Sequence, residues 1–411
     1  MSTIIVGIDF GTTYSGVSWI YAPNSNDIDA SKINIQIVQN WPARREAEAR
    51  NKVPSRISYA AGQEPKWGFR VKPRDMDALE CFELFKLLFQ AIEHYDHAED
   101  LDSLRTMLPE KLEAAQKPNI ETVIEDFLRL LWACSRESIE AVLPGGKATF
   151  DRARIRAILT VPHMWKLEAK QVTMEIATKA GIPIRDVNDI ITESEAAVHA
   201  ILHDNNHLTD FSVGDAFVLC DAGGGTVDVV SYLVLGKNPW SLRQCSHDGA
   251  LRGSIYLNLA WKAHLQEFVG GLKNWETVEE ENKGAAIRHF DETLKRIFDD
   301  EDEYCTDIHG IKGIRKLLPE TSRGRVAGVE VTHDVSDLKK TFEKVCPEIC
   351  DMVTKQVDRV RPEMIGQAGT GHAKNIYVLL AGGFSNSPYL RQAIGKATAH
   401  KPVQGVLHPQ S

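Results

Sequence analysis

The sequence lacks long apolar runs, paired cysteine motifs and an excess of basic residues. No apolar run approaches the roughly 20 residues that a membrane-spanning helix needs, and the N-terminus leads directly into a strand-like segment rather than a secretory signal. The seven cysteines are scattered without a C-x-x-C pair, so reduced thiols are expected instead of a disulfide framework or a zinc site. A net charge of -9 argues against nonspecific nucleic-acid binding. These absences predict a cytoplasmic protein with neither a membrane nor a nucleic-acid partner.

The length and composition predict a two-lobed globular protein. At 411 residues the chain is too long for one small core, and 43% hydrophobic with 26% charged residues is ordinary for a globular protein. The polar segment 203–215 is turn-prone and suits a crossing between lobes. We therefore expect a first lobe at residues 1–205 and a second lobe at residues 206–411.

Two segments of one design are the most informative feature of the chain. At residues 6–19 and 218–231, a short apolar run ends in an aspartate, Asp9 or Asp221, and a second run rich in β-branched residues follows a small-residue turn. The turn residues are Gly11, Thr12, Thr13 and Tyr14 in the first segment, and Gly223, Gly224, Gly225 and Thr226 in the second. Turns without bulky side chains let several backbone amides approach phosphate oxygens, although either turn alone could be an ordinary hairpin.

The aspartates beside these turns suit a hydrated magnesium ion. Mg²⁺ keeps several waters and is commonly held by one or two carboxylates together with substrate phosphates. Paired glycine turns with an acid in the same position therefore predict a nucleoside triphosphate bound with Mg²⁺ in a cleft between two related lobes.

The two segments resemble the ATPase region of the heat shock protein 70 family, in the actin-like superfamily. Further segments follow in the family's order. Residues 157–182 are similar to its strand, turn and following helix, and residues 190–202 to its first connecting segment. Residues 290–298 are similar to the helix that touches the adenosine, and residues 378–394 to the adenosine motif. The resemblance implies an α/β fold of the actin-like, ribonuclease H-like type, with two related lobes around a nucleotide cleft. It also implies ATP and ADP as ligands, slow Mg²⁺-dependent ATP hydrolysis coupled to lobe closure, and co-chaperone or exchange-factor partners.

The sequence also departs from the family pattern. Asn386 stands where the chaperones usually carry an arginine, Phe384 replaces a serine, and Ser194 replaces a proline. These replacements resemble divergent members of the family. The resemblance stops at Ser411, before the last helix of the ATPase region and before a peptide-binding domain, so both are expected to be absent from this chain.

The resemblance assigns phosphate and metal chemistry to a small set of residues. Asp9 and Asp221 take the positions that face the metal through water, and Asp228 matches a second carboxylate near the metal and the attacking water. Glu193 matches the acid that positions this water, although a helix N-terminus also favours an acid, with Thr192 or Ser194 as the cap and Glu195 as a simple helix acid. Lys86 is the candidate for the γ-phosphate lysine, and a place on the solvated face of a helix is the equal alternative.

The resemblance assigns the nucleoside to two further segments. On the helix that would contact adenosine, Glu292, Lys295 and Arg296 have the i, i+3, i+4 spacing of one helical face, which an intrahelical charge pair would also explain. The residues of the adenosine motif are Gly382, Gly383, Phe384 and Asn386. A glycine turn between a strand and a helix brings backbone close to a ligand.

Apolar periodicity predicts several helices. We expect them at residues 79–95, with Phe82, Phe85 and Phe89 on one face, at 120–143, through most of 255–320, and at about 334–361. His199, His203 and His207 have helical spacing but lack further metal-ligand partners, so a metal site there is not expected.

Two other functions stay open. The chain could bind nucleotide as a switch without significant hydrolysis, since Phe384 and Asn386 depart from the chaperone pattern. It could also be a small-molecule kinase of the same superfold, although no sugar-binding signature is present.

Overall fold

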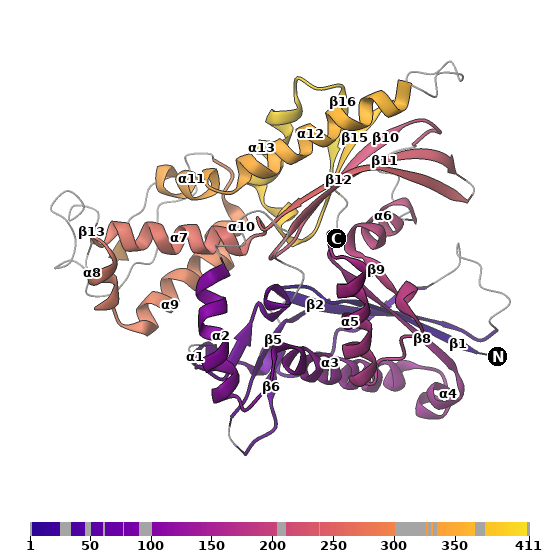
Figure 1. Cartoon of the computed structure of the whole chain (residues 1–411), viewed down its shortest axis with the longest axis horizontal. Helices are drawn as coiled ribbons and strands as arrows, with labels where there is room; N and C mark the ends of the chain where they lie inside the picture. Colours follow the sequence, from indigo (N-terminus) through magenta and orange to yellow (C-terminus); the bar gives the residue numbers. More distant parts are fainter. Residues whose placement is uncertain are drawn as a thin grey trace. The chain divides into compact units, whose positions relative to one another are not determined.

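The computed structural model describes most of the chain and divides it into two compact units, Met1–His199 and Ala200–Ser411 (Figure 1). The described residues are 2–24, 34–45, 51–60, 62–76, 78–89, 101–203, 211–237, 239–300, 326–327, 330–331, 335–365 and 375–408. The predicted lobe boundary after residue 205 lies outside them and stays a prediction, as does the crossing at 204–210. In the described part of the chain, no helix has both the length and the apolarity that a membrane crossing needs.

The first unit is built on a mixed sheet with the strand order β3-β2-β1-β8-β9. Its strands are β1 (Thr3–Asp9), β2 (Tyr14–Ala22), β3 (Gln36–Ile37), β8 (Arg154–Val161) and β9 (Ile190–Thr192). β2 pairs antiparallel with β1 and β3, whereas β1, β8 and β9 are parallel. A short strand, β4 (Val53–Pro54), also pairs with β2. The predicted strand at the N-terminus and the strand in 157–182 are confirmed.

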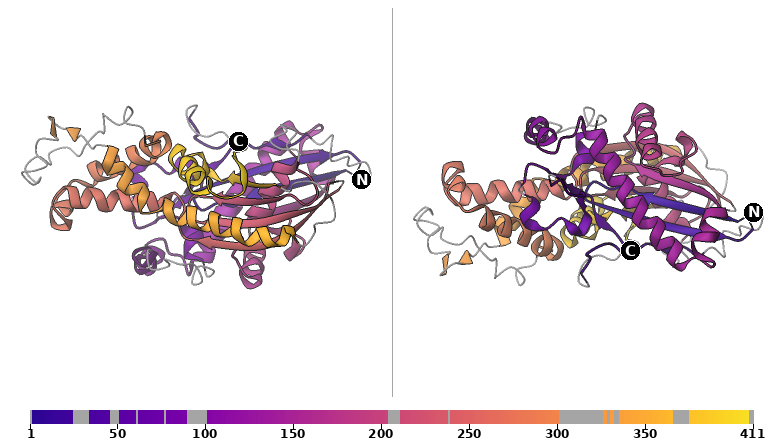
Figure 2. Two further views of the ribbon diagram at one scale, coloured as in Figure 1. Left: turned by 90° about the horizontal axis from the view of Figure 1, so that it is seen from above. Right: turned by 90° about the horizontal axis from the view of Figure 1, so that it is seen from below.

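A small antiparallel sheet and a set of helices complete the first unit. The sheet has the order β6-β5-β7, from β5 (Arg56–Ser58), β6 (Lys66–Trp67) and β7 (Cys81–Glu83). The helices are α1 (Pro73–Met76), α2 (Asp102–Ala114), α3 (Ile120–Val142), α4 (Gly146–Arg152), α5 (Leu167–Lys179) and α6 (Glu193–His203), with 3-10 turns η2 (Gly68–Arg70), η3 (Phe85–Leu88) and η6 (Val187–Asp189). The right view of Figure 2 shows α3, which packs on α5, η3 and β5.

The prediction of one helix at residues 79–95 is wrong over its described part. Cys81–Glu83 is a strand that pairs with Arg56–Ser58, and Phe85–Leu88 is a 3-10 turn. Leu84, between them, has a φ of 56°, the left-handed conformation that no helix interior adopts. The phenylalanines are buried as predicted, because a strand and a tight turn with this spacing also direct them into the core. Residues 90–95 lie outside the described part.

The second unit repeats the strand order of the first, as β12-β11-β10-β15-β16. Its strands are β10 (Ala216–Ala222), β11 (Val227–Lys237), β12 (Trp240–Ala250), β15 (Ile376–Ala381) and β16 (Val403–Leu407). β11 pairs antiparallel with β10 and β12, and β10, β15 and β16 are parallel. The parallel and antiparallel pairings match those of the first unit strand for strand. The duplication visible in two sequence segments therefore extends over both five-strand paths.

Helices cover this second sheet. α12 (Cys346–Ile365), orange in the left view of Figure 2, packs along β10, β11 and β12 and against α13 (Pro388–Thr398). The other helical elements are α7 (Ile255–Phe268), α8 (Leu272–Glu276), α9 (Glu280–His289), the π-helical η7 (Phe290–Leu294), α10 (Lys295–Ile297), α11 (Val335–Glu343) and the 3-10 turn η10 (Gly383–Asn386). A two-stranded pair joins β13 (Val326–Ala327) and β14 (Glu330–Val331).

The helix predictions for this unit hold in part. Residues 255–297 are largely helical as predicted, whereas 301–320 lie outside the described part. The single helix predicted at 334–361 is two helices, α11 and α12, separated at Lys344 and Val345. The amide of Val345 bonds to the carbonyl of Phe342 at 3.0 Å, a turn that closes α11 before Cys346 starts the next helix.

Candidate functional site

The two predicted glycine turns are hairpin turns of identical register. Asp9 pairs with Gly16 across β1 and β2, and Asp221 pairs with Asp228 across β10 and β11, a separation of seven residues in both cases. On the other side of each aspartate lies a parallel strand, with Thr160 beside Asp9 and Ala381 beside Asp221. The two aspartates therefore occupy equivalent positions at the carboxyl ends of equivalent strands.

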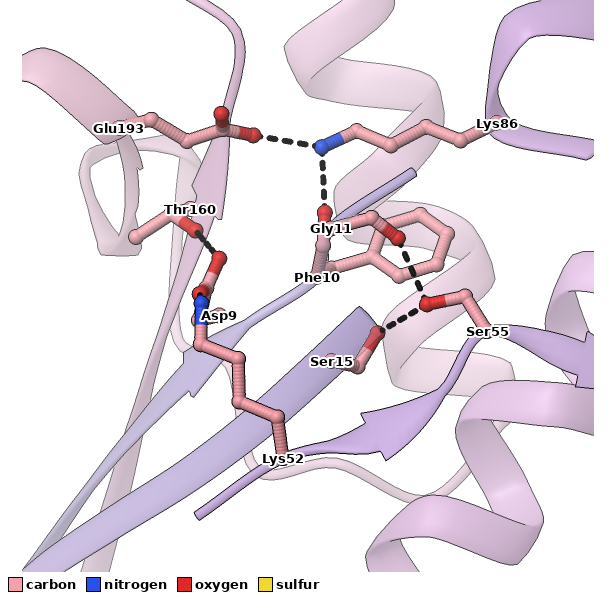
Figure 3. A network of polar contacts seen from close by, with 9 residues as sticks. All are labelled: Asp9, Phe10, Gly11, Ser15, Lys52, Ser55, Lys86, Thr160 and Glu193. Carbon is pink, nitrogen blue, oxygen red and sulfur yellow. Dashed lines mark hydrogen bonds and ion pairs between the residues drawn. The ribbon is translucent and has the colours of Figure 1, made fainter. Parts of the chain in front are cut away.

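In the first unit, neighbouring groups donate hydrogen bonds to the carbonyls of the turn (Figure 3). The Lys86 ammonium donates to the Phe10 carbonyl, the Ser55 hydroxyl donates to the Gly11 carbonyl at 2.7 Å, and the Ser55 amide donates to the Thr13 carbonyl at 2.8 Å. The Ser55 hydroxyl also lies 2.8 Å from that of Ser15. Ser55 thus bonds to the turn at both Gly11 and Thr13, a role for which the sequence carries no local signal.

This arrangement fixes the direction of the turn's amides. A trans peptide unit points its N–H opposite its C=O, so the amides of Gly11 and Thr12 point away from Lys86 and Ser55. A Cβ on Gly11 would lie 2.1 Å from the Tyr14 carbonyl oxygen, which only glycine tolerates. The Thr12 side chain is buried, and Tyr14 at the start of β2 is exposed. The turn consequently presents backbone donors on the face opposite to its own supports.

Lys86 is buried and forms an ion pair with Glu193. Its side chain is 2% exposed, its ammonium lies 2.6 Å from Glu193 Oε1, and the rings of Phe10 and Trp165 lie 5.2 and 5.6 Å away. The alternative in which Lys86 lies on a solvated helix face is wrong, because it belongs to the 3-10 turn η3 and points inward. Two residues predicted for the same chemistry, 107 positions apart, are therefore in direct contact.

The acids at the start of α6 separate into two roles. Thr192 caps the helix: its hydroxyl accepts the Glu195 amide at 3.1 Å, and the Glu195 carboxylate accepts the Thr192 amide at 2.8 Å, which is a capping box. Burial raises the pKa of Glu195, but these hydrogen bonds outweigh it, so its pKa lies below the usual value. Glu195 is thus the helix acid, and Glu193 is the acid that faces Lys86.

Asp9 is a partly exposed carboxylate with both oxygens engaged. Thr160 Oγ1 donates to Oδ1 at 3.3 Å, and Lys52 Nζ lies 2.5 Å from Oδ2 (Figure 3). Burial raises the pKa of Asp9, but the charge and hydrogen bond of Lys52, with the charge of Lys86, lower it below its usual value. With 38% of its side chain exposed, an ionised Asp9 has the donor chemistry that a hydrated divalent cation requires.

In the second unit, backbone amides at the start of α7 donate hydrogen bonds to the carbonyls of the glycine turn. The amides of Gly253, Ser254 and Ile255 donate to the carbonyls of Gly225, Gly223 and Gly224 at 3.1, 3.1 and 2.9 Å. The amides of Gly224, Gly225 and Thr226 therefore point away from α7, by the same peptide geometry as in the first turn. A Cβ on Gly253 would lie 2.4 Å from the Gly224 carbonyl oxygen, so Gly253 belongs to the site although the sequence did not identify it. Its signal is a glycine between a strand and a helix.

Two carboxylates lie across from one another next to this turn. Asp221 is half-buried, and its cross-strand partner Asp228 is 2% exposed. Like charges directly opposite on adjacent strands destabilise a sheet. Burial raises the pKa of the neighbouring Cys220, and both aspartates raise it further. Carboxylates placed together in this way are the ligand type that a hydrated divalent cation takes.

The adenosine motif brings one of its two glycines directly against Asp221. Gly382 has φ 80° and ψ 161°, and a Cβ there would lie 2.4 Å from the Ala222 carbonyl oxygen and 2.5 Å from Asp221 Oδ1. Gly383 differs, because a Cβ there meets no atom within 4 Å. Phe384 is buried, whereas Asn386 is exposed and its Nδ2 donates to the Gly383 carbonyl at 3.3 Å. Packing thus explains Gly382 and leaves Gly383 with no structural reason to lack a side chain.

The structure does not bring Glu292, Lys295 and Arg296 to one face. Glu292 and Arg296 are exposed, whereas Lys295 is 9% exposed and bonds to Asp291, to Asn258 Oδ1 at 3.1 Å and to the Ser254 carbonyl at 3.4 Å. The physical reason is the π-helical turn at Phe290–Leu294, which changes the rotation per residue just before Lys295. The predicted charge pair is also different, since Lys295 pairs with Asp291 rather than with Glu292.

A hydrogen bond links Lys295 to the backbone beside the second glycine turn. Burial lowers the pKa of Lys295 and outweighs the opposing charge of Asp291. Burial raises the pKa of Asp291, but Lys295 outweighs it and the net pKa is lowered. Since the Ser254 carbonyl accepts from Lys295 and the Ser254 amide donates to Gly223, the buried pair supports the backbone that holds the turn.

Other candidate chemistry finds no support in the described part of the chain. There, no group of three or more His, Cys, Asp or Glu residues is arranged to hold a metal ion by itself. His207 lies outside the described residues, so the expectation that the histidine series holds no metal stays a prediction. The described cysteines are free thiols, as the sequence predicted. No protein-family model matches the chain.

Proposed function

We propose that the chain is the ATP-binding, Mg²⁺-dependent ATPase region of a heat shock protein 70-like protein with the actin-like, ribonuclease H-like fold. The observation that carries the proposal is the repeated hairpin. In both units, an aspartate lies at the end of a strand or one residue before it, beside a turn whose carbonyls accept hydrogen bonds on one side and whose amides face the other way. Such amides are suited to phosphate oxygens, and the adjacent carboxylate is suited to a hydrated cation.

In this proposal, the two units bind one nucleotide and close around it. The amides of Gly11, Thr12, Gly224, Gly225 and Thr226 bind phosphate oxygens, and Asp9 and Asp221 hold the waters of Mg²⁺. When bound, Mg²⁺ would neutralise charge that develops on the phosphates. Gly383 leaves room for the nucleoside, because no side chain occupies the space beside it. Its cellular setting in the proposal is the cytoplasm, with co-chaperone or exchange-factor proteins as partners.

For hydrolysis, Glu193 is the residue proposed to orient the attacking water. Its carboxylate bonds to the buried Lys86 through Oε1, which holds the side chain in one orientation beside the Phe10 carbonyl. A fixed carboxylate accepts a hydrogen bond from water and directs its lone pair. Lys86 supplies a desolvated positive charge at the same point, which stabilises negative charge on a transferred phosphoryl group.

Calorimetry tests the binding half of the proposal. ATP and ADP should bind the purified chain in the presence of Mg²⁺, and binding should weaken about tenfold or more for Gly224→Val, whose side chain fills the space of the turn. Gly395→Ala is the matched control, because Gly395 lies in α13 and a Cβ there meets no atom within 4 Å. A folded wild-type chain that binds neither nucleotide would reject the proposal.

A second candidate is a nucleotide switch without significant hydrolysis. Lys295, which the family resemblance assigned to adenosine, is instead engaged by Asp291 and Asn258, and Asn386 lies exposed where an arginine is usual. Single-turnover hydrolysis of radiolabelled ATP by wild type and Glu193→Ala decides between the two. A wild-type rate that Glu193→Ala lowers supports the ATPase, and equal rates near background support the switch. Phosphate found on a sugar hydroxyl would instead indicate a small-molecule kinase.

A further inference from the structure

Lys52 places an ammonium group on the carboxylate proposed to face the metal. Its Nζ lies 2.5 Å from Asp9 Oδ2, and its side chain is 49% exposed (Figure 3). Lys52 directly precedes β4, which pairs with β2 through Val53 opposite Ser15. The lysine is therefore fixed at its backbone by the sheet, while its side chain remains accessible to water and ions.

A glycine on the neighbouring strand makes this contact possible. Gly16 is the cross-strand partner of Asp9, and a Cβ on Gly16 would lie 3.2 Å from Lys52 Cγ and 3.8 Å from its Cε. The Lys52 stem thus passes over the bare backbone of Gly16 on its way to Asp9. A side chain at position 16 would meet this stem.

The second hairpin has a different group in the corresponding place. Asp228 occupies the position of Gly16, seven residues after its own aspartate. One hairpin therefore presents two carboxylates across from each other, and the other presents one carboxylate covered by an ammonium. The two hairpins have the same register but different groups next to the aspartate.

We infer that Lys52 is an internal cation that occupies Asp9 when nucleotide is absent and competes with the hydrated divalent cation for that carboxylate. The inference rests on the proposed function in that it concerns the same site. The Lys52 ammonium takes up an acceptor site of Oδ2 and repels an incoming cation, so Lys52 raises the concentration of divalent cation that is needed to occupy Asp9. A lysine ammonium suits this role because it is a compact, hydrated point charge on a flexible stem.

The contact is weak enough to be displaced. Partly exposed ion pairs gain little net free energy, since water screens both charges and the long side chain loses rotamer freedom. Lys52 therefore shifts an equilibrium and does not block the site permanently. Its removal should strengthen divalent-cation binding at Asp9 by about fivefold, the upper end for a pair of this exposure.

Manganese titration without nucleotide tests the inference directly. Mn²⁺ broadens the amide signals of nearby residues, so the loss of the Phe10 and Gly11 signals reports binding at Asp9. We expect Lys52→Gln to bind Mn²⁺ about fivefold more tightly than wild type, and Lys52→Arg, which keeps the charge, to stay close to wild type. Lys66→Gln is the matched control, because Lys66 is 37% exposed, pairs with Asp75 at 2.9 Å and removes the same charge away from the hairpin.

Two outcomes of this titration would overturn the inference. Equal Mn²⁺ affinities for wild type and Lys52→Gln would show that the lysine does not compete. An equal gain for Lys52→Gln and Lys66→Gln would show a general effect of net charge.

Nucleotide titration separates this inference from the proposed function. In EDTA, ADP affinity should be the same for wild type and Lys52→Gln, whereas the Mg²⁺ concentration that gives half-maximal enhancement of ADP binding should fall about fivefold in the variant. Weaker ADP binding in EDTA would overturn the inference and make Lys52 a phosphate contact. If ADP binds no variant but Mn²⁺ behaves as expected, the proposed function fails while the competition by Lys52 stands.

Discussion

We expect the adjacent Gly382 and Gly383 to respond to one substitution in different ways. Gly382→Ala places a methyl group 2.4 Å from the Ala222 carbonyl oxygen and 2.5 Å from Asp221 Oδ1, whereas Gly383→Ala places the same group in open space. The two variants have identical composition and differ by one position. They therefore separate the structural requirement for glycine from a requirement imposed by a ligand.

The expected loss of stability for Gly382→Ala follows from its backbone and its contacts. A φ of 80° with a ψ of 161° lies in a region that essentially only glycine adopts, at a cost of about 1–3 kcal/mol for another residue. Overlap with a backbone carbonyl adds about 1–3 kcal/mol, because neither β10 nor β15 can shift without breaking their pairing. The sum is about 2–6 kcal/mol, which lowers the melting temperature of a unit of this size by roughly 5–20 °C.

Gly383→Ala should leave stability unchanged within about 0.5 kcal/mol, or raise it slightly, because alanine has fewer unfolded conformations to lose. If a nucleoside approaches position 383, the methyl group of the introduced alanine should weaken ADP binding about tenfold without affecting folding. Differential scanning calorimetry gives the stability of both variants, and titration calorimetry gives the affinity of Gly383→Ala. A stable Gly383→Ala variant that binds ADP like wild type would refute the assignment of this glycine to the ligand.

Three further predictions concern the polar groups of the first unit. Lys86→Met should lower the free energy of unfolding by about 3 kcal/mol in urea denaturation, because it leaves Glu193 partly buried without its cation. Lys66→Met, at a pair whose lysine is 37% exposed, should cost less than about 1 kcal/mol. Glu195→Ala should cost about 1 kcal/mol through loss of the capping box, and Glu195→Gln, which can still accept the Thr192 amide, should cost less. Burial raises the pKa of Asp126, but Lys117, Arg129 and Tyr59 lower it below 3.8, so the ionised carboxylate contributes stability above about pH 5 that is lost as pH falls through the native pKa. The stability difference between wild type and Asp126→Asn should therefore be constant from pH 5 to 7 and shrink below pH 3.8. A difference that grows on acidification would contradict the assignment.

Local patterns in the sequence predicted the elements whose signals are themselves local. The hairpin register needs only an apolar run, an aspartate and a turn of small residues, and both copies form as predicted. The helix predicted at 120–143 spans Ile120–Val142, because the Asn119 side chain accepts the Thr122 amide at its start and Pro144 and Gly145 follow its end. Neither feature depends on distant parts of the chain.

The helix prediction that failed, and the surroundings of Lys295 that the sequence did not indicate, both depend on distant residues. Phe82, Phe85 and Phe89 have helical spacing, but Cys81–Glu83 is drawn into a strand by Arg56–Ser58, about 25 positions earlier. Lys295 turns inward because Asn258 and the Ser254 carbonyl lie beneath it, and the π-helical turn accommodates that contact. Periodicity along one segment carries no information about such partners.

The same reasoning explains which site residues the sequence missed. Ser55, Gly253 and Lys52 carry no motif of their own, and each acts through a contact with a residue that does. Ser55 bonds to the Gly11 carbonyl, Gly253 packs on Gly224, and Lys52 pairs with Asp9. Sequence motifs indicated the groups that would face a ligand. The structure adds the residues that contact and position those groups.

The two turns are alike in backbone but differ in what supports them, and this difference makes them separable by mutation. In the first unit, side chains hold the carbonyls, since Lys86 and the Ser55 hydroxyl are the donors to Phe10 and Gly11. In the second unit, backbone amides at the start of α7 bond to them, and the Lys295 side chain acts one step further away, on the Ser254 carbonyl. Truncation of Ser55 to alanine therefore removes one direct donor from the first turn without disturbing a helix, whereas the direct donors to the second turn are backbone amides. We therefore expect Ser55→Ala to weaken ADP binding in titration calorimetry. Gly253→Ala should also lower the melting temperature in scanning calorimetry, because its Cβ would lie 2.4 Å from the Gly224 carbonyl oxygen.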